Sequence, residues 1–345
     1  MRIGDRLVGP GAPAYIIAEA GVNHDGSRAD ALRLVDVAAE AGADAVKFQI
    51  FRAAELATAA ATTATYQRAA GHRSQRKMLT RLELSDEDFA AIRAYCRRRS
   101  IEFLATPFTP ADLDRLEPLD VRAIKIASTD VDNAPLLRRA CQAGLPLIVS
   151  TGASTTAELR RMVLWLRTWG AGARAILLHC VSCYPTPLEA ANLRAIQALR
   201  DAFALPCGYS DHTRSTETGA WAVLAGACAL EKHFTLDRTA SGPDHALSLT
   251  PPELGQYITA VRRAELALGT GTVGLTELEF DVRAVARKSA VTRRPLKAGT
   301  ALAEDVLAFK RPGGGIPPDQ LRHVIGRRLT VAVPADTMLT WDMLR

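Results

Sequence analysis

The feature that most constrains this chain is an alternation of short apolar runs with helical stretches over its first 265 or so residues. The stretches between the runs place apolar residues at i, i+3 and i+4, as in residues 28–43, where Gly42 is the expected helix terminator. Eight such alternations predict an α/β fold, a (β/α)8 TIM barrel. The rival, a doubly wound open sheet, lacks its G-x-G-x-x-G turn after the first run. The expected strands span residues 14–19, 44–49, 102–106, 122–127, 146–150, 174–180, 206–209 and 228–233.

Nearly every expected strand ends in a polar residue that can bind a ligand or ionise. In a barrel of this kind the carboxyl ends of the strands meet on one face, where catalytic groups gather. The long segment 50–78 follows the second strand, and we expect its Tyr66, Gln67, Ser74 and Gln75 to cover a ligand there. The strand-end residues are Glu19, Lys47, Gln49, Thr106, Lys125, Ser128, Ser150, Thr151, Ser182, Tyr184, Ser210, His212, Glu231 and His233.

Two of these residues, His212 and His233, lie 21 positions apart, which is the length of one helix plus one strand. This spacing puts both imidazoles at the same end of neighbouring strands. Two imidazoles with carboxylates beside them suit Mn²⁺, Zn²⁺ or Fe²⁺, and fewer than four protein ligands leave positions open for a substrate. The pair is therefore a candidate divalent-metal site.

Lysine is rare in this chain, with seven among 43 basic residues, yet Lys47, Lys125 and Lys232 all fall at expected strand ends. A compact ammonium at such a place suggests a cradle for a phosphate or a carboxylate. Together with the hydroxyl residues beside them, Lys47 and Lys125 suit a small phosphate ester, and Glu19 is placed to act as an acid or a base. The residues alone thus suggest a phosphorylated three-carbon unit condensing with a carbonyl compound.

The composition excludes several other classes of protein. The net charge of +6 comes from scattered basic residues with no aromatic interleaving, so we expect no nucleic-acid partner. No apolar run approaches a membrane span and the start lacks a signal-peptide core, so we expect a cytoplasmic protein without a membrane partner. Cys180 and Cys183 form a C-x-x-C pair, but the following YPTP blocks the helix that a redox motif needs.

The character of the chain changes after residue 270. We expect a catalytic barrel over 1–270, a linker over 271–284 and a small β-rich domain over 285–345. A domain of about 60 residues is marginally stable by itself, so we expect it to pack on something larger.

In its motifs and their order the sequence resembles the sialic acid synthase family, which includes N-acetylneuraminate synthases and their legionaminate and pseudaminate relatives. The resemblance runs in family order from residue 16 to about residue 326, and the tail resembles the family's antifreeze-like (SAF) domain. The stretches that carry it are IIAEAGVNHDGS, AGADAVKFQ, LELS, EFLATPF, IKIAS, IVSTGAS, LLHCVSCYPTP, GYSDHT, EKHFTLDR, GPDHALSL and FKRPGGGI.

The resemblance implies a metal-dependent condensation of phosphoenolpyruvate with the open-chain aldehyde of an N-acylated mannosamine-type sugar. By this resemblance His212 and His233 hold Mn²⁺, with Mg²⁺ or Co²⁺ as alternatives, and Glu19 is the acid or base. The residues implied to bind phosphoenolpyruvate are Lys47, Thr106, Lys125, Ser128, Ser150 and Ser210. Those implied to orient the sugar are Gln49, Tyr184 and Asp244.

The resemblance further implies a domain-swapped homodimer, in which Arg311 reaches the partner's site near the N-acyl group. Two positions depart from the family pattern. Asp130 stands where many bacterial members have glutamate and is expected to keep its role, and Ser182 stands where some have asparagine, facing the sugar. His245 is expected to support the site without binding the metal.

Other functions remain open from the sequence. A class I aldolase would use Lys125 or Lys47 as a Schiff base and would need no metal. A second alternative is condensation of phosphoenolpyruvate with another aldose or a sugar phosphate. A non-catalytic carbohydrate- or ice-binding protein would not need the lysines and histidines at the strand ends.

Overall fold

The computed structural model describes residues 1–64, 67–68, 71 and 73–345, so Tyr66 lies outside the described residues. The chain divides into two compact units, Met1–Gly269 and Thr270–Arg345. Within the described ranges, no helix combines the length and the apolar character needed to cross a membrane.

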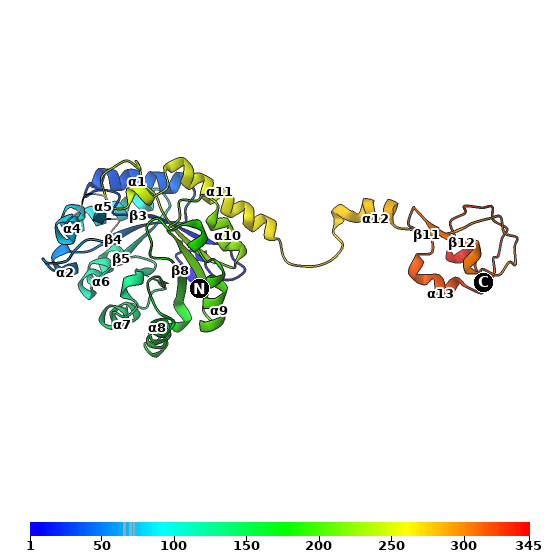
Figure 1. The fold of residues 1–345 in the computed structure, drawn as a ribbon, viewed down its shortest axis with the longest axis horizontal. Helices are drawn as coiled ribbons and strands as arrows, with labels where there is room; N and C mark the ends of the chain where they lie inside the picture. The colour runs from blue at the N-terminus through cyan, green and yellow to red at the C-terminus, as the bar shows by residue number, and fades with distance from the viewer. Residues whose placement is uncertain (65–66, 69–70, 72) are drawn as a thin grey trace. The chain divides into compact units, whose positions relative to one another are not determined.

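The first unit is the predicted TIM-type barrel (Figure 1). Its eight strands are parallel and lie in the order β5-β4-β3-β10-β9-β8-β7-β6, and the two end strands β5 and β6 are in contact, which closes the sheet. Each predicted run overlaps one strand. The strands are β3 (Tyr15–Gly21), β4 (Ala45–Ile50), β5 (Glu102–Pro107), β6 (Ile124–Ile126), β7 (Leu147–Ser150), β8 (Ala175–Cys180), β9 (Cys207–Asp211) and β10 (Ala229–His233).

Helices follow the strands and cover the outside of the barrel (Figure 1). Their starts carry the local signals that the sequence shows, for example a capping box between Thr155 and Glu158 at α8. Helix α1 ends just before Gly42, which adopts a positive φ of 83°, as predicted for a terminator. The helices are α1 (Arg28–Glu40), α2 (Ala53–Leu56), α4 (Gln75–Leu82), α5 (Asp86–Arg98), α6 (Pro110–Leu116), α7 (Ala134–Gln142), α8 (Thr156–Thr168), α9 (Arg194–Phe203), α10 (Thr218–Leu224) and α11 (Pro251–Leu268).

The barrel has two apolar layers that fix where a ligand can enter. The outward-facing strand residues pack with the helices in one large core. Inward-facing residues such as Ile17, Ile148 and Leu178 fill the barrel interior toward the amino ends of the strands. The N-terminal hairpin, β1 (Arg2–Ile3) with β2 (Arg6–Leu7), adds Ile3 to that inner layer. The inner layer is thus apolar toward the amino ends of the strands, and the polar groups gather at the carboxyl ends.

The second unit has its own small core around Ala290, Leu307 and Leu329. It contains α12 (Phe280–Ala286), α13 (Leu321–Val324) and the antiparallel pair β11 (Ser289–Thr292) and β12 (Leu307–Lys310). Helix α12 begins inside the segment predicted as a linker, and the backbone N–H of Gly313 donates to the carbonyl of Ala284 at 2.9 Å.

Candidate active site

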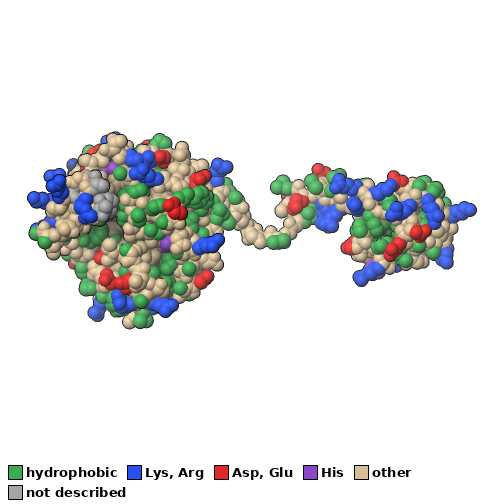
Figure 2. Space-filling view, viewed as in Figure 1, with side chains coloured by type: hydrophobic (Ala, Val, Ile, Leu, Met, Phe, Trp, Pro, Cys, Tyr) green, Lys and Arg blue, Asp and Glu red, His purple; other side chains and the backbone are tan. Residues whose placement is uncertain are grey.

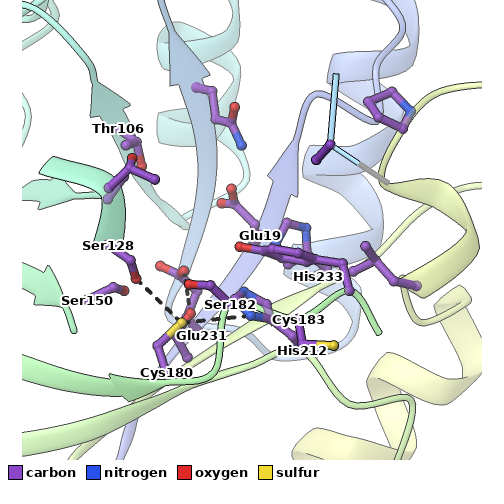
Figure 3. Close-up of a pocket in the computed structure, with 18 of the residues that line it drawn as sticks. Glu19, Thr106, Ser128, Ser150, Cys180, Ser182, Cys183, His212, Glu231 and His233 are labelled. Carbon is purple, nitrogen blue, oxygen red and sulfur yellow. Dashed lines mark hydrogen bonds between the residues drawn. The ribbon is translucent and has the colours of Figure 1, made fainter. Parts of the chain in front are cut away.

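A cavity of about 1110 Å³ opens at the carboxyl ends of the barrel strands, and its floor is polar (Figure 3). The structure brings together most of the residues that the sequence singled out. Those lining the cavity are Glu19, Lys47, Gln49, Thr106, Lys125, Ser128, Ser150, Ser182, Tyr184, Ser210, His212, Glu231 and His233.

A buried cluster of two lysines and two glutamates forms the floor. Strand register sets Lys47 beside Glu19, and their Nζ and Oε2 atoms lie 2.7 Å apart. The Oε2 atom of Glu231 lies 3.6 Å from Nζ of Lys47 and 3.8 Å from Nζ of Lys125, and no hydrogen bond reaches it. All four side chains are almost fully buried, so the charges on the floor balance one another in a poorly solvated space.

Hydroxyl groups complete the surroundings of both lysines. Lys47 Nζ donates to Thr106 Oγ1 at 2.9 Å, and Lys125 Nζ donates to Ser150 Oγ at 2.7 Å. Ser210 Oγ donates to Glu231 Oε1 at 3.0 Å. Ammonium and hydroxyl donors that converge in this way suit the oxygens of a phosphate or a carboxylate.

The surroundings separate the pKa values of the two glutamates. Burial raises the pKa of Glu19 to about 7, against the opposing effect of Lys47. Burial would also raise the pKa of Glu231, but Lys125, Lys47 and His233 outweigh it and hold the value at about 2. One carboxyl group therefore exchanges a proton near neutral pH while the other stays ionised, a combination that suits acid–base chemistry.

The surroundings also separate the pKa values of the two lysines. Burial lowers the pKa of Lys125 more than Glu231 restores it. For Lys47, burial also opposes the charge, but the carboxylates of Glu19 and Glu231 outweigh it and raise the pKa. Lys47 thus remains an ammonium group, while Lys125 is easier to deprotonate than an ordinary lysine.

His212 and His233 lie side by side at the carboxyl ends of β9 and β10, with ring centroids 5.5 Å apart. Nδ1 of His212 lies 2.8 Å from the carbonyl oxygen of Val181, an acceptor that fixes the Nδ1–H tautomer and leaves the Nε2 lone pair available. Nδ1 of His233 is buried without a hydrogen-bond partner. Burial holds the pKa of His233 well below its usual value, so this ring is neutral, as a metal ligand must be.

This donor set fits a divalent ion that keeps coordination positions open for substrate. Across the part of the chain that the structure describes, no group of three or more His, Cys, Asp or Glu residues is arranged to hold a metal. Two imidazoles would therefore be the protein's contribution, and the ring of Tyr184 packs on His212 with centroids 4.3 Å apart. Burial would lower the pKa of His212, but Cys180 and the carbonyl of Val181 outweigh it and raise the value, so an ion that binds there would displace a proton.

Several predicted residues do not line the cavity: Ser74, Asp130, Thr151, Lys232, Asp244 and Arg311. The hydroxyl of Thr151 donates to the carbonyl of Leu178 at 3.0 Å. The carboxylate of Asp130 accepts hydrogen bonds from Asn133 Nδ2 at 2.9 Å and from Thr129 Oγ1 at 3.3 Å, so it is held beside the site. Asp244 is buried next to the floor, since a Cβ on Gly21 would contact Asp244 Oδ2, Gln49 Nε2 and Glu19 Oε1. Burial raises the pKa of Asp244 to about 6.

Arg311 belongs to the second unit, where it is exposed and its Nε donates to the carbonyl of Ala286 at 3.1 Å. Its expected role in a partner's site stays a prediction. His245 has both ring nitrogens engaged, with Asp25 at 3.0 Å and Thr235 at 2.6 Å, which fits a supporting part.

Lys232 departs from the expectation that strand-end lysines line the site. It alternates with Glu231 and His233 along β10, so its side chain points out of the barrel, where Nζ lies 3.0 Å from Asp211 Oδ2. Sequence position at a strand end was therefore not enough, because the two-residue period of a strand decides which face a side chain takes.

The structure also adds cavity residues that the sequence reasoning did not select. Cys180 ends β8, and its Sγ lies 3.5 Å from Ser128 Oγ and 3.7 Å from His212 Nδ1 (Figure 3). Its place as the last residue of a strand was the signal that could have found it. Gln67 and Gln75 from segment 50–78 line the cavity as expected, together with the apolar residues Leu56, Leu79 and Phe108.

The position of Gly152 is closed to any larger residue. A Cβ there would overlap Ser182 Oγ and Cys180 Sγ. Ser182 Oγ is itself buried without a hydrogen-bond partner, so the strand-end loops leave one polar atom at the cavity wall unsatisfied.

Comparison with known proteins places this geometry among related chains. Residues 34–273 match the model of the NeuB family, and residues 287–345 match that of the SAF domain. The N,N'-diacetyllegionaminic acid synthase of Legionella pneumophila is 39% identical over 97% of this chain and 95% of its own length. The N-acetylneuraminate-9-phosphate synthase of Mus musculus is 32% identical over 96% of this chain and 92% of its own length.

Two solved structures are also similar to this chain. The N-acetylneuraminic acid synthetase of Leptospira borgpetersenii superimposes with a TM-score of 0.73 at 35% identity, covering 82% of this chain and 94% of that one. A putative spore coat polysaccharide biosynthesis protein E from Chromobacterium violaceum gives a TM-score of 0.80 at 24% identity, covering 96% of this chain and 99% of that one, and this likeness shows the fold alone.

Proposed function

This chain belongs to the NeuB family, and from that premise we propose that it condenses phosphoenolpyruvate with the aldehyde of an N-acylated amino sugar. The products would be a nonulosonic acid and inorganic phosphate. The observation that carries the proposal is the floor of the cavity, where two buried lysines, their hydroxyl partners and an acid–base glutamate adjoin a pair of imidazoles.

Each part of the floor has a task in this reaction. Lys47 and Lys125, with Thr106, Ser150 and Ser128, would bind the phosphate and carboxylate of phosphoenolpyruvate. Glu19 would move a proton during the reaction, as its pKa near 7 allows. Carbon 3 of phosphoenolpyruvate would form the new bond to the aldehyde carbon, water would add at carbon 2, and phosphate would leave with cleavage of its C–O bond.

His212 and His233 would hold a divalent ion, Mn²⁺ before Mg²⁺ or Co²⁺. Such an ion supplies a Lewis acid for the acceptor's carbonyl oxygen. The protein's own part is to hold and orient the two imidazoles: the carbonyl of Val181 orients His212, and burial keeps His233 neutral. Gln49, Tyr184, Ser182 and Asp244 surround the space beside this pair and would orient the sugar.

We further expect a cytoplasmic homodimer with exchanged small domains, in which Arg311 reaches the site of the partner. The exposed guanidinium of Arg311 supports this expectation, since it is free to meet another surface. Light scattering gives the oligomeric state. Mixing an Arg311→Ala chain with a His212→Ala chain would restore activity in the mixed dimer if each site takes its arginine from the partner.

The experiment that tests the proposal is release of phosphate from phosphoenolpyruvate with Mn²⁺, measured across several N-acylated amino sugars with and without EDTA. Release that needs an acceptor and stops with EDTA is the expected result. A folded protein that binds Mn²⁺ and releases no phosphate with any amino sugar would overturn the proposal.

One observation favours a second function, a class I aldolase. The lowered pKa of Lys125 is what an amine needs to form a Schiff base with pyruvate. Borohydride reduction in the presence of pyruvate tests it, with Lys125→Met as control. We expect no trapped adduct, because the ammonium of Lys125 donates to Ser150 Oγ and to the carbonyl of Ile126 at 2.7 and 2.9 Å.

A further inference from the structure

A buried carboxamide, that of Asn23, ties together two connections that border the cavity. Asn23 lies in the turn after β3, shortly beyond Glu19, and is only 3% exposed. Its Nδ2 donates to the carbonyl of Phe234 at 2.8 Å and to Ser248 Oγ at 2.9 Å. A backbone carbonyl can only accept, so the contact with Phe234 fixes the orientation of the amide, and both of its N–H groups are used. One side chain thus joins the ends of β3 and β10 to the segment before α11.

The first of these contacts lies beside two residues of the site. Phe234 directly follows His233, and its backbone N–H donates to the carbonyl of Glu19 at 3.1 Å. In the register of the barrel, His233 is itself the partner of Glu19. The backbone N–H of Asn23 donates to the carbonyl of Ala20 at 2.9 Å. The backbone at the proposed acid–base glutamate and at one proposed metal ligand is therefore fastened to the same residue.

The second contact reaches the segment that carries Asp244. Ser248 Oγ accepts from Asn23 and donates to the carbonyl of Asp244 at 2.6 Å. The carboxylate of Asp244 faces the space beside Glu19 and Gln49. The neighbours of Asp244 in the chain line the cavity: Pro243, Ala246 and Leu247. The contact between Asn23 and Ser248 therefore helps to set where this side of the cavity stands.

A separate fastening holds the same segment from its other side. The ring of His245 lies between Asp25 Oδ2 at 3.0 Å and Thr235 Oγ1 at 2.6 Å. This ring is almost fully buried, and it does not depend on the carboxamide of Asn23. Loss of that carboxamide should therefore displace Asp244 without unfolding the segment around it.

The groups proposed to bind phosphoenolpyruvate have supports of their own. Lys47 donates to Thr106 at 2.9 Å and Lys125 donates to Ser150 at 2.7 Å. These contacts join β4 to β5 and β6 to β7, and Asn23 takes no part in them. The fastening made by Asn23 thus acts on the half of the cavity proposed for the sugar.

We propose that Asn23 is a positioning residue for the acceptor. Through Ser248 it holds the carboxylate of Asp244 where that group can orient the amino sugar, and it touches no substrate itself. This inference rests on the proposed function and deepens it, because it assigns the placement of the sugar to a side chain outside the cavity lining.

Replacement of the carboxamide tests the proposal. Asn23→Ala removes both donors, and kcat/KM for the amino sugar in phosphate release with Mn²⁺ should fall by about 100-fold, the cost of a displacement of about 1 Å. The Kd of phosphoenolpyruvate, measured by calorimetry, should stay within about twofold of the wild-type value, because its supports are separate. Ser248→Ala breaks only the branch to Asp244 and should cause a similar loss for the sugar. This second variant decides the question by itself if Asn23→Ala folds poorly.

The two variants combined measure whether they act through one contact. The double variant Asn23→Ala with Ser248→Ala should lose about as much kcat/KM for the sugar as Asn23→Ala alone. Two separate losses that multiply would overturn the inference.

A core variant controls for a general loss of stability. Leu166 is fully buried on α8, in the core between the helices and the strands. Leu166→Ala should lower the free energy of unfolding while kcat/KM for the sugar, per folded molecule, stays within about twofold of the wild-type value. An Asn23→Ala protein that behaves in the same way, or one in which the Kd of phosphoenolpyruvate rises as much as the sugar is weakened, would overturn the inference.

A binding measurement keeps this inference apart from the proposed function. The alditols of the amino sugars lack the aldehyde and cannot react, so calorimetry with the Mn²⁺-loaded protein measures acceptor binding without turnover. If no amino sugar gives phosphate release, the proposed function fails. Weaker alditol binding by Asn23→Ala, with unchanged binding of phosphoenolpyruvate, would then still support the inference. Equal alditol affinity in the two proteins, or no alditol bound by the wild-type protein, would overturn it.

Discussion

Strands β9 and β10 bury charged side chains on both of their faces, and the two faces are built differently. On the inner face, Glu231 and Ser210 meet Lys47 and Lys125 at the cavity floor. On the outer face, Lys232 meets Asp211 under helices α10 and α11. Both lysine sets are about equally buried, so burial alone does not distinguish a site from a structural ion pair.

The charged groups of the outer pair, Lys232 and Asp211, have hydrogen-bond partners as well as each other. Lys232 Nζ lies 3.0 Å from Asp211 Oδ2, donates to the carbonyl of Thr213 at 2.5 Å and lies 5.3 Å from the centre of the Tyr257 ring. Asp211 also accepts from the backbone N–H of Thr213 at 2.9 Å and from Thr218 Oγ1. Such a pair, with its hydrogen bonds satisfied, fixes the register of the two strand ends.

The inner face keeps unsatisfied atoms. Glu231 Oε2, His233 Nδ1 and Ser182 Oγ are buried without a hydrogen-bond partner. A buried polar atom without a partner costs free energy, and these three atoms belong to residues that line the cavity, where a ligand can supply the partner. The outer face has such an atom too, Tyr257 Oη, but Tyr257 is not part of the cavity lining. The position of the unsatisfied atoms at the cavity therefore marks the inner face as functional.

The largest expected effect is on the inner face, at the imidazole pair. His212→Ala should lower kcat/KM by about 10⁴-fold, because one of two proposed ligands is lost, and should weaken Mn²⁺ binding measured by electron paramagnetic resonance. The matched control is His179→Gln, since His179 is buried on β8 with a hydrogen bond to the carbonyl of Ala191 at 2.9 Å. Equal Mn²⁺ affinity in all three proteins would contradict the metal assignment.

On the outer face, the effect should appear in stability. Lys232→Met leaves Asp211 buried without its cation and should cost about 3–5 kcal/mol of unfolding free energy in urea denaturation. Asp211→Asn combined with Lys232→Met removes both charges, so the double variant should recover most of this loss. If the single and double variants are equally destabilised, the pair itself contributes no coupling.

A smaller effect, confined to the inner face, depends on pH. Glu19 has a pKa of about 7 in the folded protein against its ordinary value of 4.5, so between these pH values the folded state holds a proton that the unfolded chain has lost. Its stabilising contribution is present below about pH 4.5 and declines as the pH rises to 7. Glu231, whose pKa is about 2, has the opposite effect: its stabilising contribution is present above about pH 4.5 and is lost as the pH falls toward 2.

Denaturation with EDTA from pH 5 to pH 8 measures this contribution. The wild-type protein should lose on the order of 1–3 kcal/mol relative to Glu19→Gln across that range. Parallel pH profiles for the two proteins would show that the Glu19 carboxyl does not titrate there.

The alternation of apolar runs predicted the barrel, and position at a strand end predicted most of the floor. Lys232 shows the limit of that reasoning, because the facing of a residue depends on strand register, which a neighbour such as Asp211 helps to set. The charged residues on the face of the barrel drawn in Figure 2 are scattered, which agrees with a solvated surface without testing the absence of a nucleic-acid partner.

The cavity wall could not be predicted for a different reason. Leu56 and Leu79 reach the cavity because the segment after β4 folds back over the barrel end, and apolar spacing in short helices does not reveal that path. Asp130 follows the strand-end rule in sequence, yet Asn133 holds its carboxylate away from the cavity lining.

One matched pair of variants, Lys125→Met and Lys232→Met, tests most directly whether the inner face serves the chemistry and the outer face the structure. Each variant is measured for kcat of phosphate release and for unfolding free energy. Lys125→Met removes one partner of buried Glu231, which keeps Lys47 at 3.6 Å and Ser210 at 3.0 Å, so the variant should lose less stability than Lys232→Met while its activity is lost. Lys232→Met should lose stability and keep its activity per folded molecule. The opposite pattern, with an active Lys125→Met protein or an inactive but stable Lys232→Met protein, would contradict the assignment of the inner face to chemistry and the outer face to structure.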